Sequence, residues 1–389
     1  MGVRKLNKFL TTKQLITEHN NLYEYVKTLE LHPEQNNCKT KQIVIAIDFW
    51  LYAHKFLHSS RSNNIVMGFW NQIIKILSYG AIPVYIADGY VPIEKEDEYY
   101  SRKRRFERKK GDIDKINETL DEYDEYIGLD EIEGIELAER VGHTTDTINV
   151  DQIDALIEKR ERLLKQIKRV NRRELRNILS MFETMSVPFI RACYEADALC
   201  VKLYKDGLIT TCMSDDMDML ALGCGSTIKF DNGKLIEFNL ERIKSGLELD
   251  QEQFIDICIM FGCGYLRHPI RIECQRAYEI IKESGSLLDA LFRDDYPEFN
   301  TESRNIRVLG ENYHSVQDIY LYSPDKETSP EFLFDYISPH GELVWSVIRE
   351  YLESAEWFDT TYVRTMRHAK YDIHTIIQNF KNAQAIADT

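Results

Sequence analysis

The sequence predicts an α/β fold built on a parallel β-sheet flanked by helices, and three observations lead to this prediction. Two continuous apolar runs, residues 42–47 and 82–87, suit buried central strands. A segment with helical spacing, residues 65–79, lies between them and stops at Gly80, which gives the strand–helix–strand order of a parallel sheet. The chain of 389 residues is long enough for one large domain or two ordinary ones.

Composition excludes several classes of protein. No run of eighteen apolar residues is present, so a membrane span is not expected, and the first residues lack the apolar region of a signal peptide. Eight cysteines are scattered without a Cys-x-x-Cys pair, which indicates neither a zinc site nor a disulfide framework. A reducing compartment fits this pattern best.

The other elements follow from local patterns along the chain. An Asn232-Gly233 pair between alternating residues predicts a β-hairpin. We expect the remaining elements as follows: helix and loop over 7–37, a helix over 49–57, a strand over 187–190, a buried strand over 208–211, the hairpin over 227–238, amphipathic helices over 251–262 and 274–293, and alternating helix and loop over the last residues, in which we find no chemistry.

Charge is distributed unevenly in the middle of the chain. The net charge of the protein is −15, yet residues 111–158 alone hold sixteen Asp or Glu and two Lys or Arg, a net charge of −14. Basic stretches lie on both sides, at 102–110 and 159–176, and this asymmetry keeps a nucleic-acid partner possible. The pattern predicts one long helix over 152–181. The glycines of the segment suggest flexible joints at Gly111, Gly128, Gly134 and Gly142.

Carboxylates follow each of the four predicted parallel strands. Asp216 and Asp218 are two residues apart, so in extended backbone their side chains would point the same way. Crowded like charges are costly unless a cation lies between them, and oxygen ligands suit Mg²⁺ or Mn²⁺. The simpler interpretation is that each carboxylate caps a helix or lies in a solvated loop. The six carboxylates at strand ends are Asp48, Asp88, Glu195, Asp197, Asp216 and Asp218.

Several short motifs occur in a characteristic order and spacing over about residues 1–295. They are Met1-Gly2-Val3, Ile47-Asp48, Asp88-Gly89 with Pro92, Lys95 and Arg102, Val187-Pro188-Phe189, Glu195-Ala196-Asp197-Ala198, residues 214–220 (Ser-Asp-Asp-Met-Asp-Met-Leu), and Gln251-Glu252-Gln253-Phe254-Ile255-Asp256 running to Gly262. In their order and spacing these motifs resemble the flap endonuclease and XPG/Rad2 family of structure-specific 5′ nucleases, particularly the diverged members of large DNA viruses.

The resemblance implies a role for each of these residues. Four carboxylates, Asp48, Asp88, Glu195 and Asp197, would serve a first Mg²⁺ ion, and Asp216 and Asp218 a second, with Mn²⁺ able to substitute. Lys95 and Arg102 would act on the scissile phosphate, whose developing charge requires fixed cations. Gly2 would allow close approach of DNA, and His54 would stack on a base. An arch helix would contact phosphates through Arg162, Lys165, Arg169, Arg172, Arg173 and Arg176, although an ordinary charged helix has the same pattern.

The sequence departs from the family pattern at two positions. Where the family has Gly-x-Asp-Tyr, with the Asp serving the second metal, this chain has Gly264 in place of the Asp. The next loop reads Arg271-Ile272-Glu273 instead of Gly-Ile-Gly, and Glu273 would repel phosphate. The acidic block 111–158 is either disordered or mimics nucleic acid. No sliding-clamp motif is found.

The sequence therefore predicts a PIN-like parallel sheet with a helical arch insertion and a helix–two-turn–helix-like extension. The expected activity is that of a Mg²⁺-dependent flap endonuclease or 5′–3′ exonuclease. Its DNA would carry a 5′ flap, a nick or a free 5′ end. Alternatives are an inactive homologue that binds branched nucleic acid or a protein, and an RNA-directed nuclease. We expect a monomer in the nucleus or at a viral replication site. The expected regions are 1–110 and 181–250 (nuclease), 111–180 (acidic insertion and arch), 251–295 (DNA binding) and 296–389 (unknown role).

Overall fold

The structure is a computed structural model. It describes residue 3 and residues 5–39, 42–58, 64–127, 150–185, 187–265, 272–293, 295–299, 304–326 and 331–332. Contacts divide the chain into two compact units, one formed by Met1–Lys95 with Asn171–Thr389 and the other by Glu96–Val170. The second unit begins and ends earlier than the insertion expected at 111–180.

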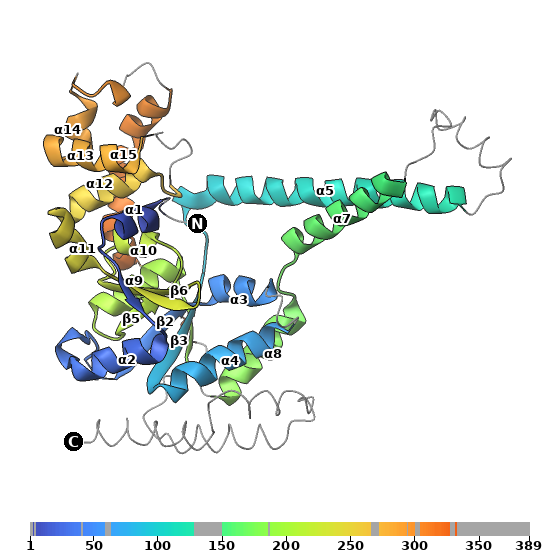
Figure 1. Ribbon diagram of the computed structural model, residues 1–389, viewed down its shortest axis with the longest axis horizontal. Helices are drawn as coiled ribbons and strands as arrows, with labels where there is room; N and C mark the ends of the chain where they lie inside the picture. Colours follow the sequence, from blue (N-terminus) through green and yellow to red (C-terminus); the bar gives the residue numbers. More distant parts are fainter. Residues whose placement is uncertain are drawn as a thin grey trace. The chain divides into compact units, whose positions relative to one another are not determined.

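An eight-stranded sheet forms the centre of the first unit (Figure 1). Its strand order is β1-β7-β6-β5-β2-β3-β4-β8. The five strands from β6 to β4 run parallel, and the outer strands β1, β7 and β8 pair antiparallel. The predicted fold class is confirmed. The strands are β1 (Thr17–His19), β2 (Ile43–Asp48), β3 (Ala81–Ala87), β4 (Phe189–Arg191), β5 (Thr211–Met213), β6 (Ser226–Asp231), β7 (Lys234–Asn239) and β8 (Glu331–Phe332).

Alternate residues of the central strands face two different cores, as the two-residue period of a strand requires. Val44 and Ala46 of β2 belong to a large aliphatic core with the helices on one face of the sheet. On β3, Tyr85 belongs to the opposite face, where it stacks on Phe182 with ring centroids 4.5 Å apart. Phe69 packs edge-on against the same tyrosine at 5.4 Å. The sheet is therefore covered on both faces, which explains the continuous apolar runs of β2 and β3.

Helices of the first unit cover these two faces. The aromatic face carries α3 (Phe49–Leu57), α4 (Ile65–Ser78) and α8 (Arg172–Thr184), which lie together in Figure 1. The aliphatic core is shared by α1 (Leu6–Thr12), α9 (Ala196–Lys205), α10 (Asp218–Ala221), α11 (Leu240–Leu247), α12 (Gln251–Phe261), α13 (Cys274–Ser284), α14 (Leu287–Leu291) and α15 (Arg304–Lys326). The other helices in the described part of this unit are α2 (Leu22–Leu31) and the 3₁₀ turns η1 (Pro33–Gln35), η2 (Ile93–Lys95) and η3 (Pro297–Phe299). None of the helices in the described ranges combines the length and apolar character that a membrane crossing requires.

The described residues of the second unit form a pair of helices, α5 (Glu96–Ile127) and α7 (Val150–Ile167). Ile116 and Leu120 of α5 form a small apolar cluster with Ile153 of α7. Arg169, just after α7, places its guanidinium 3.7 Å from the ring centroid of Phe106 on α5. A small buried cluster and a cation–π contact therefore hold the two helices together.

The structure corrects two predictions about the middle of the chain. Gly111 lies inside the continuous helix α5, so it is not a joint, and the acidic residues from 111 to 127 are helical. Gly128, Gly134 and Gly142 lie outside the described residues. The single helix expected over 152–181 is two helices, because Asn171 starts α8 with a capping box: its Oδ1 accepts from the amide of Glu174 at 2.9 Å.

Two further elements differ from the predictions. The expected strand 208–211 begins only at Thr211, and Leu208 is half exposed. The expected helix 274–293 is divided at Gly285, whose φ of 88° ends α13, and Ser286 then caps α14. The hairpin was predicted correctly: Asn232 and Gly233 have φ angles of 48° and 85°, the two positive values that a type I′ turn needs.

Candidate active site

The first unit brings the carboxylates together through the topology of its sheet. From β2 the chain continues to β3 and β4 on one side, whereas β5 pairs with β2 on the other side. Such a reversal of strand order leaves a crevice at the carboxyl ends of the two strands, where open α/β sheets bind ligands. Asp48 is the last residue of β2, and Asp215 and Asp216 follow shortly after β5.

Asp48 and Asp88 are both held by backbone amides at helix starts. Asp48 caps α3, and its Oδ1 accepts from the amide of Leu51 at 3.1 Å. Asp88 follows β3, and its Oδ1 accepts from the amide of Ala196 at 2.9 Å. The second bond joins the end of β3 to the first turn of α9. The helix-cap interpretation is therefore correct for Asp48 as a local structure.

Glu195 and Asp197 lie at the start of α9, as predicted. Glu195 precedes the helix and pairs with the ammonium group of Lys95. Asp197 lies in the first helical turn, and its buried Oδ1 has no hydrogen-bond partner among the residues that the structure describes. A buried carboxylate oxygen without a donor is costly, so a cation is a natural partner for Asp197.

The loop after β5 supplies Asp216 and Asp218 in a geometry different from the expected one. Asp218 is the first residue of α10, so the two side chains do not project from extended backbone. Instead, the amide of Asp218 donates to Asp216 Oδ1 at 3.0 Å. Asp218 is 3% exposed. The neighbouring Asp215 forms an ion pair of 2.6 Å with Lys55 of α3.

The charges of these carboxylates affect one another, and we call the group the carboxylate cluster: Asp48, Asp88, Glu195, Asp197, Asp216 and Asp218. Burial, followed by the charge of Asp88, raises the pKa of Asp48 to about 7. Burial and then the charge of Asp216 raise the pKa of Asp218 to about 7, although Lys95 and Tyr320 act against the shift. The pKa of Asp197 is also raised well above its usual value by burial and then by Asp216 and Asp48.

Lys95 is the positive charge at this cluster. Burial alone would lower the pKa of its ammonium group, but Glu195, Asp218 and Asp197 outweigh this effect and hold the pKa above its usual value. Its Nζ also lies 4.7 Å from the ring centroid of Tyr265. Lys95, which was predicted as a site residue, therefore lies among carboxylates, and its positive charge offsets part of their mutual repulsion.

The donor set suits a hard divalent cation such as Mg²⁺ or Mn²⁺. Asp197 Oδ1, which accepts no hydrogen bond from the described part of the chain, and the mutual repulsion of the cluster both favour such an ion. Within the described residues, however, no three Asp, Glu, His or Cys side chains are arranged as the ligands of one metal ion. The six-carboxylate metal site therefore stays a prediction, supported by donor chemistry and not by coordination geometry.

Two tyrosines also contact the cluster, and neither was predicted as a site residue. Tyr265 donates to Glu195 Oε2 at 2.9 Å, and Tyr320 of α15 donates to Asp218 Oδ1 at 3.1 Å. Tyr265 directly follows Gly264, so its place in the motif was a usable signal. Tyr320 gave no local signal, because its contact spans about a hundred residues of sequence.

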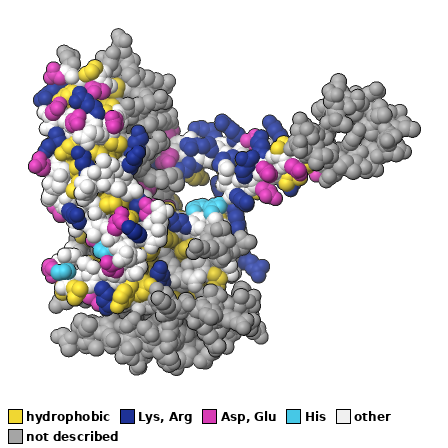
Figure 2. Space-filling model, viewed as in Figure 1, with side chains coloured by type: hydrophobic (Ala, Val, Ile, Leu, Met, Phe, Trp, Pro, Cys, Tyr) yellow, Lys and Arg dark blue, Asp and Glu magenta, His cyan; other side chains and the backbone are white. Residues whose placement is uncertain are grey.

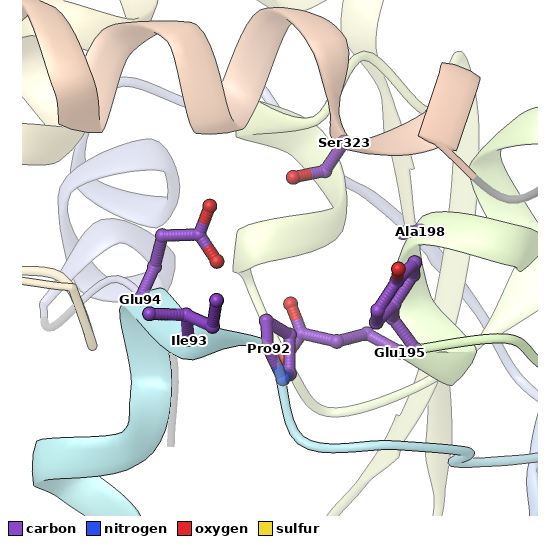
Figure 3. A pocket seen from close by; sticks show the side chains of 7 residues that line it. Pro92, Ile93, Glu94, Glu195, Ala198 and Ser323 are labelled. Atoms are coloured by element: carbon purple, nitrogen blue, oxygen red, sulfur yellow. The ribbon is translucent and has the colours of Figure 1, made fainter.

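A cavity of about 150 Å³ lies beside Glu195 (Figure 3). Figure 3 shows Ile93 and Glu94 on one side, Glu195 and Ala198 on the other, and Ser323 of α15 above them. Pro92 and Tyr194 complete its lining. Ser323 is therefore a second residue of α15, besides Tyr320, that lies near the carboxylate cluster.

The other predicted residues fall into three groups. His54 is exposed on α3, its ring parallel to that of His58 at 6.4 Å. Gly2 and Arg271 lie outside the described residues. In the second unit, Arg102 is exposed and donates from Nε to Glu98 at 3.0 Å. Figure 2 shows Lys and Arg side chains gathered along this basic stretch of α5. The six arch candidates are all exposed, but they do not lie on one helix as predicted: Arg162, Lys165 and Arg169 belong to the second unit, whereas Arg172, Arg173 and Arg176 lie on α8 of the first unit.

Comparison with known proteins gives a consistent result. The XPG I-region matches residues 186–264, the stretch that holds Glu195, Asp197, Asp216 and Asp218. The flap endonuclease 1 of Monosiga brevicollis is 26% identical over 314 residues, which cover 76% of this chain and 73% of that protein. The chain is a distant homologue of the XPG/Rad2 nucleases. It spans about two thirds of the length of the flap endonucleases that it matches.

Solved XPG/Rad2 structures share the fold. The catalytic core of Rad2 in complex with a DNA substrate has a TM-score of 0.52 at 18% identity, covering 90% of this chain and 96% of that one. The flap endonuclease-1 of Methanococcus jannaschii has a TM-score of 0.52 at 15% identity, and the match covers 98% of this chain and 99% of that one. XPG/Rad2 homology and the shared fold agree with the resemblance found in the sequence. Members of the XPG/Rad2 family are metal-dependent structure-specific nucleases.

Proposed function

We propose that this protein is a divalent-metal-dependent nuclease that cuts DNA carrying a 5′ flap, a nick or a free 5′ end, acting in replication, repair or recombination. One observation supports the proposal above the others. Carboxylates that follow four parallel strands are close enough to raise one another's pKa values, and Lys95 is paired with one of them, Glu195. A purely structural cluster of buried like charges would be costly.

In this proposal Asp48, Asp88, Glu195 and Asp197 hold one ion, and Asp216 and Asp218 hold another. Bound divalent ions supply Lewis-acid stabilisation of the attacking and leaving oxygens of a phosphodiester. The protein supplies fixed orientation: the amides of Leu51 and Ala196 hold one oxygen each of Asp48 and Asp88. Because these carboxylates are already ordered, little reorganisation is needed when substrate arrives.

Lys95 and the exposed arginines would act on the nucleic acid itself. The ammonium group of Lys95 is confined at the cluster by Glu195, where it can stabilise charge that develops on a scissile phosphate. Arg102 would assist from the start of α5. Arg172, Arg173 and Arg176 are exposed on α8 and would neutralise phosphates along the DNA backbone, a contribution that weakens as salt concentration rises.

A second candidate is a homologue that binds branched nucleic acid without cutting it. Two features favour it: Gly264 stands where the family pattern has a carboxylate, and Glu273, which precedes α13, would weaken phosphate contacts there.

One assay separates the two candidates. The protein is incubated in Mg²⁺ with end-labelled 5′-flap, nicked and single-stranded DNA, and binding to the same DNA is measured in Ca²⁺. A nuclease cleaves the flap or nicked DNA near the junction. A protein that binds branched DNA in Ca²⁺ but leaves every substrate intact in both Mg²⁺ and Mn²⁺ is the binding homologue. RNA versions of the substrates identify an RNA-directed enzyme.

A further inference from the structure

Helix α15 contributes a buried hydroxyl group to the carboxylate cluster. The side chain of Tyr320 is 1% exposed, and its hydroxyl donates to Oδ1 of Asp218, itself 3% exposed, at 3.1 Å. The helix packs directly against α9 and α12. The contact therefore joins a helix near the end of the described chain to the loop that follows β5.

The position of this hydroxyl is fixed by the ring that carries it. Tyr320 packs edge-on against Tyr265, with centroids 5.3 Å apart and planes at 89°. Tyr265 in turn donates to Glu195 Oε2 at 2.9 Å, and Lys95 lies over its ring. The two tyrosines thus form a pair in which each ring supports the other and each hydroxyl holds one oxygen of a different carboxylate.

The same helix offers an internal comparison. Tyr313, two turns earlier on α15, donates to Oδ1 of Asp256 at 2.8 Å, and this bond is also buried. Asp256 additionally accepts from the amide of Leu287, so it ties α12, α14 and α15 together. It is not a member of the carboxylate cluster. A Tyr–Asp hydrogen bond on this helix can therefore be purely structural, and the two bonds allow that role to be measured separately.

We infer that Tyr320 is a positioning residue that orients Asp218 toward a divalent cation by holding Oδ1 and leaving Oδ2 for the ion. This inference rests on the proposed metal-binding role of Asp218. The chemistry is that of a hydrogen bond to a ligating carboxylate, which fixes its rotamer and the direction of its lone pairs. Position 264 has no side chain to contribute, so support for Asp218 comes from a helix distant in sequence.

The test compares Tyr320→Phe with Tyr313→Phe in the full chain. Each variant removes one hydroxyl and one buried Tyr–Asp bond, so both are expected to lower the melting temperature. Isothermal titration with Mn²⁺, without DNA, then reports the cluster itself. We expect about tenfold weaker Mn²⁺ binding in Tyr320→Phe, the size of effect typical when a partner of a metal ligand is removed, and unchanged binding in Tyr313→Phe.

A double-mutant cycle shows whether Tyr320 acts through Asp218. In an Asp218→Asn background, Tyr320→Phe is expected to change Mn²⁺ binding little, because the orienting bond then has no carboxylate to orient. Unchanged Mn²⁺ affinity in folded Tyr320→Phe overturns the inference, as do equal losses in both tyrosine variants or the absence of any Mn²⁺ binding by the wild-type protein. If the single Tyr320→Phe chain does not fold, the comparison is made within the Asp218→Asn background, where a full tenfold effect overturns the inference.

The outcome is distinguishable from a failure of the proposed function. If the wild-type protein binds Mn²⁺ but cuts no DNA, the nuclease assignment is wrong. The Mn²⁺ titration of Tyr320→Phe still tests the role of Tyr320 in that case. A wild-type protein that cuts DNA while Tyr320→Phe binds Mn²⁺ normally keeps the nuclease assignment and removes the inference. If the protein is a nuclease and Tyr320 also positions Asp218, the Tyr320→Phe variant has a lower kcat at subsaturating Mg²⁺. Its kcat returns to the wild-type value at high Mg²⁺, and its KM for DNA changes little.

Discussion

The backbone amide of Ala196 donates a 2.9 Å hydrogen bond to Asp88 Oδ1 and so connects the end of β3 to the start of α9. One carboxylate of the cluster therefore positions the helix that carries two others, Glu195 and Asp197. Neighbouring acidic side chains at a helix N-terminus are also stabilised by the helix dipole. This arrangement places like charges side by side in the folded protein, and that crowding has measurable consequences.

The stability of the metal-free protein is expected to rise as the pH falls from about 7 to about 4. The folded-state pKa values of Asp48 and Asp218 are raised to about 7, above the usual value for Asp of about 3.9, so the folded state binds more protons than the unfolded state in this window. Thermal unfolding at several pH values measures the slope. Asp218→Asn should flatten it and leave the melting temperature at pH 7.5 equal to or above that of the wild type. A steeper slope in this variant would contradict the crowding of charges.

Lys95→Ala is expected to lower the rate of DNA cleavage roughly 10²- to 10³-fold, because the variant lacks the fixed cation that stabilises the charge developing on the scissile phosphate. Affinity for DNA should change far less, since the effect lies in the transition state. Single-turnover kinetics and gel-shift binding measure the two separately. Lys244→Ala is the matched control: it removes a lysine of similar exposure, 19% against 22%, that is also ion-paired. Equal effects of both variants on rate would exclude the assignment of Lys95.

Arg172→Ala is expected to weaken DNA binding and to reduce the slope of log Kd against log salt by about 1, because one phosphate contact is lost. The exposed Arg242, which donates to Thr17 at 2.7 Å, serves as a control outside the basic stretch. Fluorescence anisotropy over a range of salt concentrations measures both. A variant that loses affinity without any change of slope would argue against a phosphate contact.

Gly264→Asp is expected to strengthen metal binding, so the Mg²⁺ concentration for half-maximal cleavage should fall. The backbone allows the change: Gly262, which ends α12, has a φ of 96°, whereas Gly264 is not among the described glycines with positive φ. Gly264→Ala should therefore fold normally and leave the Mg²⁺ requirement unchanged. A loss of melting temperature in both variants would instead indicate steric strain at this position.

The main parts of the fold could be predicted because they have strong local signals. The runs that became β2 and β3 are buried on both faces, and the Asn232-Gly233 turn is fixed by its φ angles. The break between α7 and α8 also had a local signal, the Asn171-x-x-Glu174 capping box, which helical periodicity concealed. Strand β1 is only three residues long and depends on pairing with β7, so periodicity could not reveal it.

The site was predictable to the extent that topology determines it. Carboxylates that follow parallel strands meet at one edge of the sheet, even though β5 lies beside β2 and not beside β4. The local geometry of Asp216 and Asp218 could not be predicted from topology. The backbone there is not extended but forms a turn, which the hydrogen bond from the amide of Asp218 to the carboxylate of Asp216 stabilises. Tyr320 was missed because its partner is a hundred positions away, and no spacing rule connects them.

Cleavage of a 5′-flap DNA, titrated with Mg²⁺, tests the central claim most directly. The wild-type protein is expected to release the flap with a rate that rises with Mg²⁺ and saturates. Asp216→Ala, folded and still able to bind the flap in Ca²⁺, should lose at least about a hundredfold in rate, because one of the charges that would hold the second ion is gone. A wild-type protein that binds the flap yet releases no product at any Mg²⁺ or Mn²⁺ concentration, or an Asp216→Ala variant that cuts as fast as the wild type, would contradict the account.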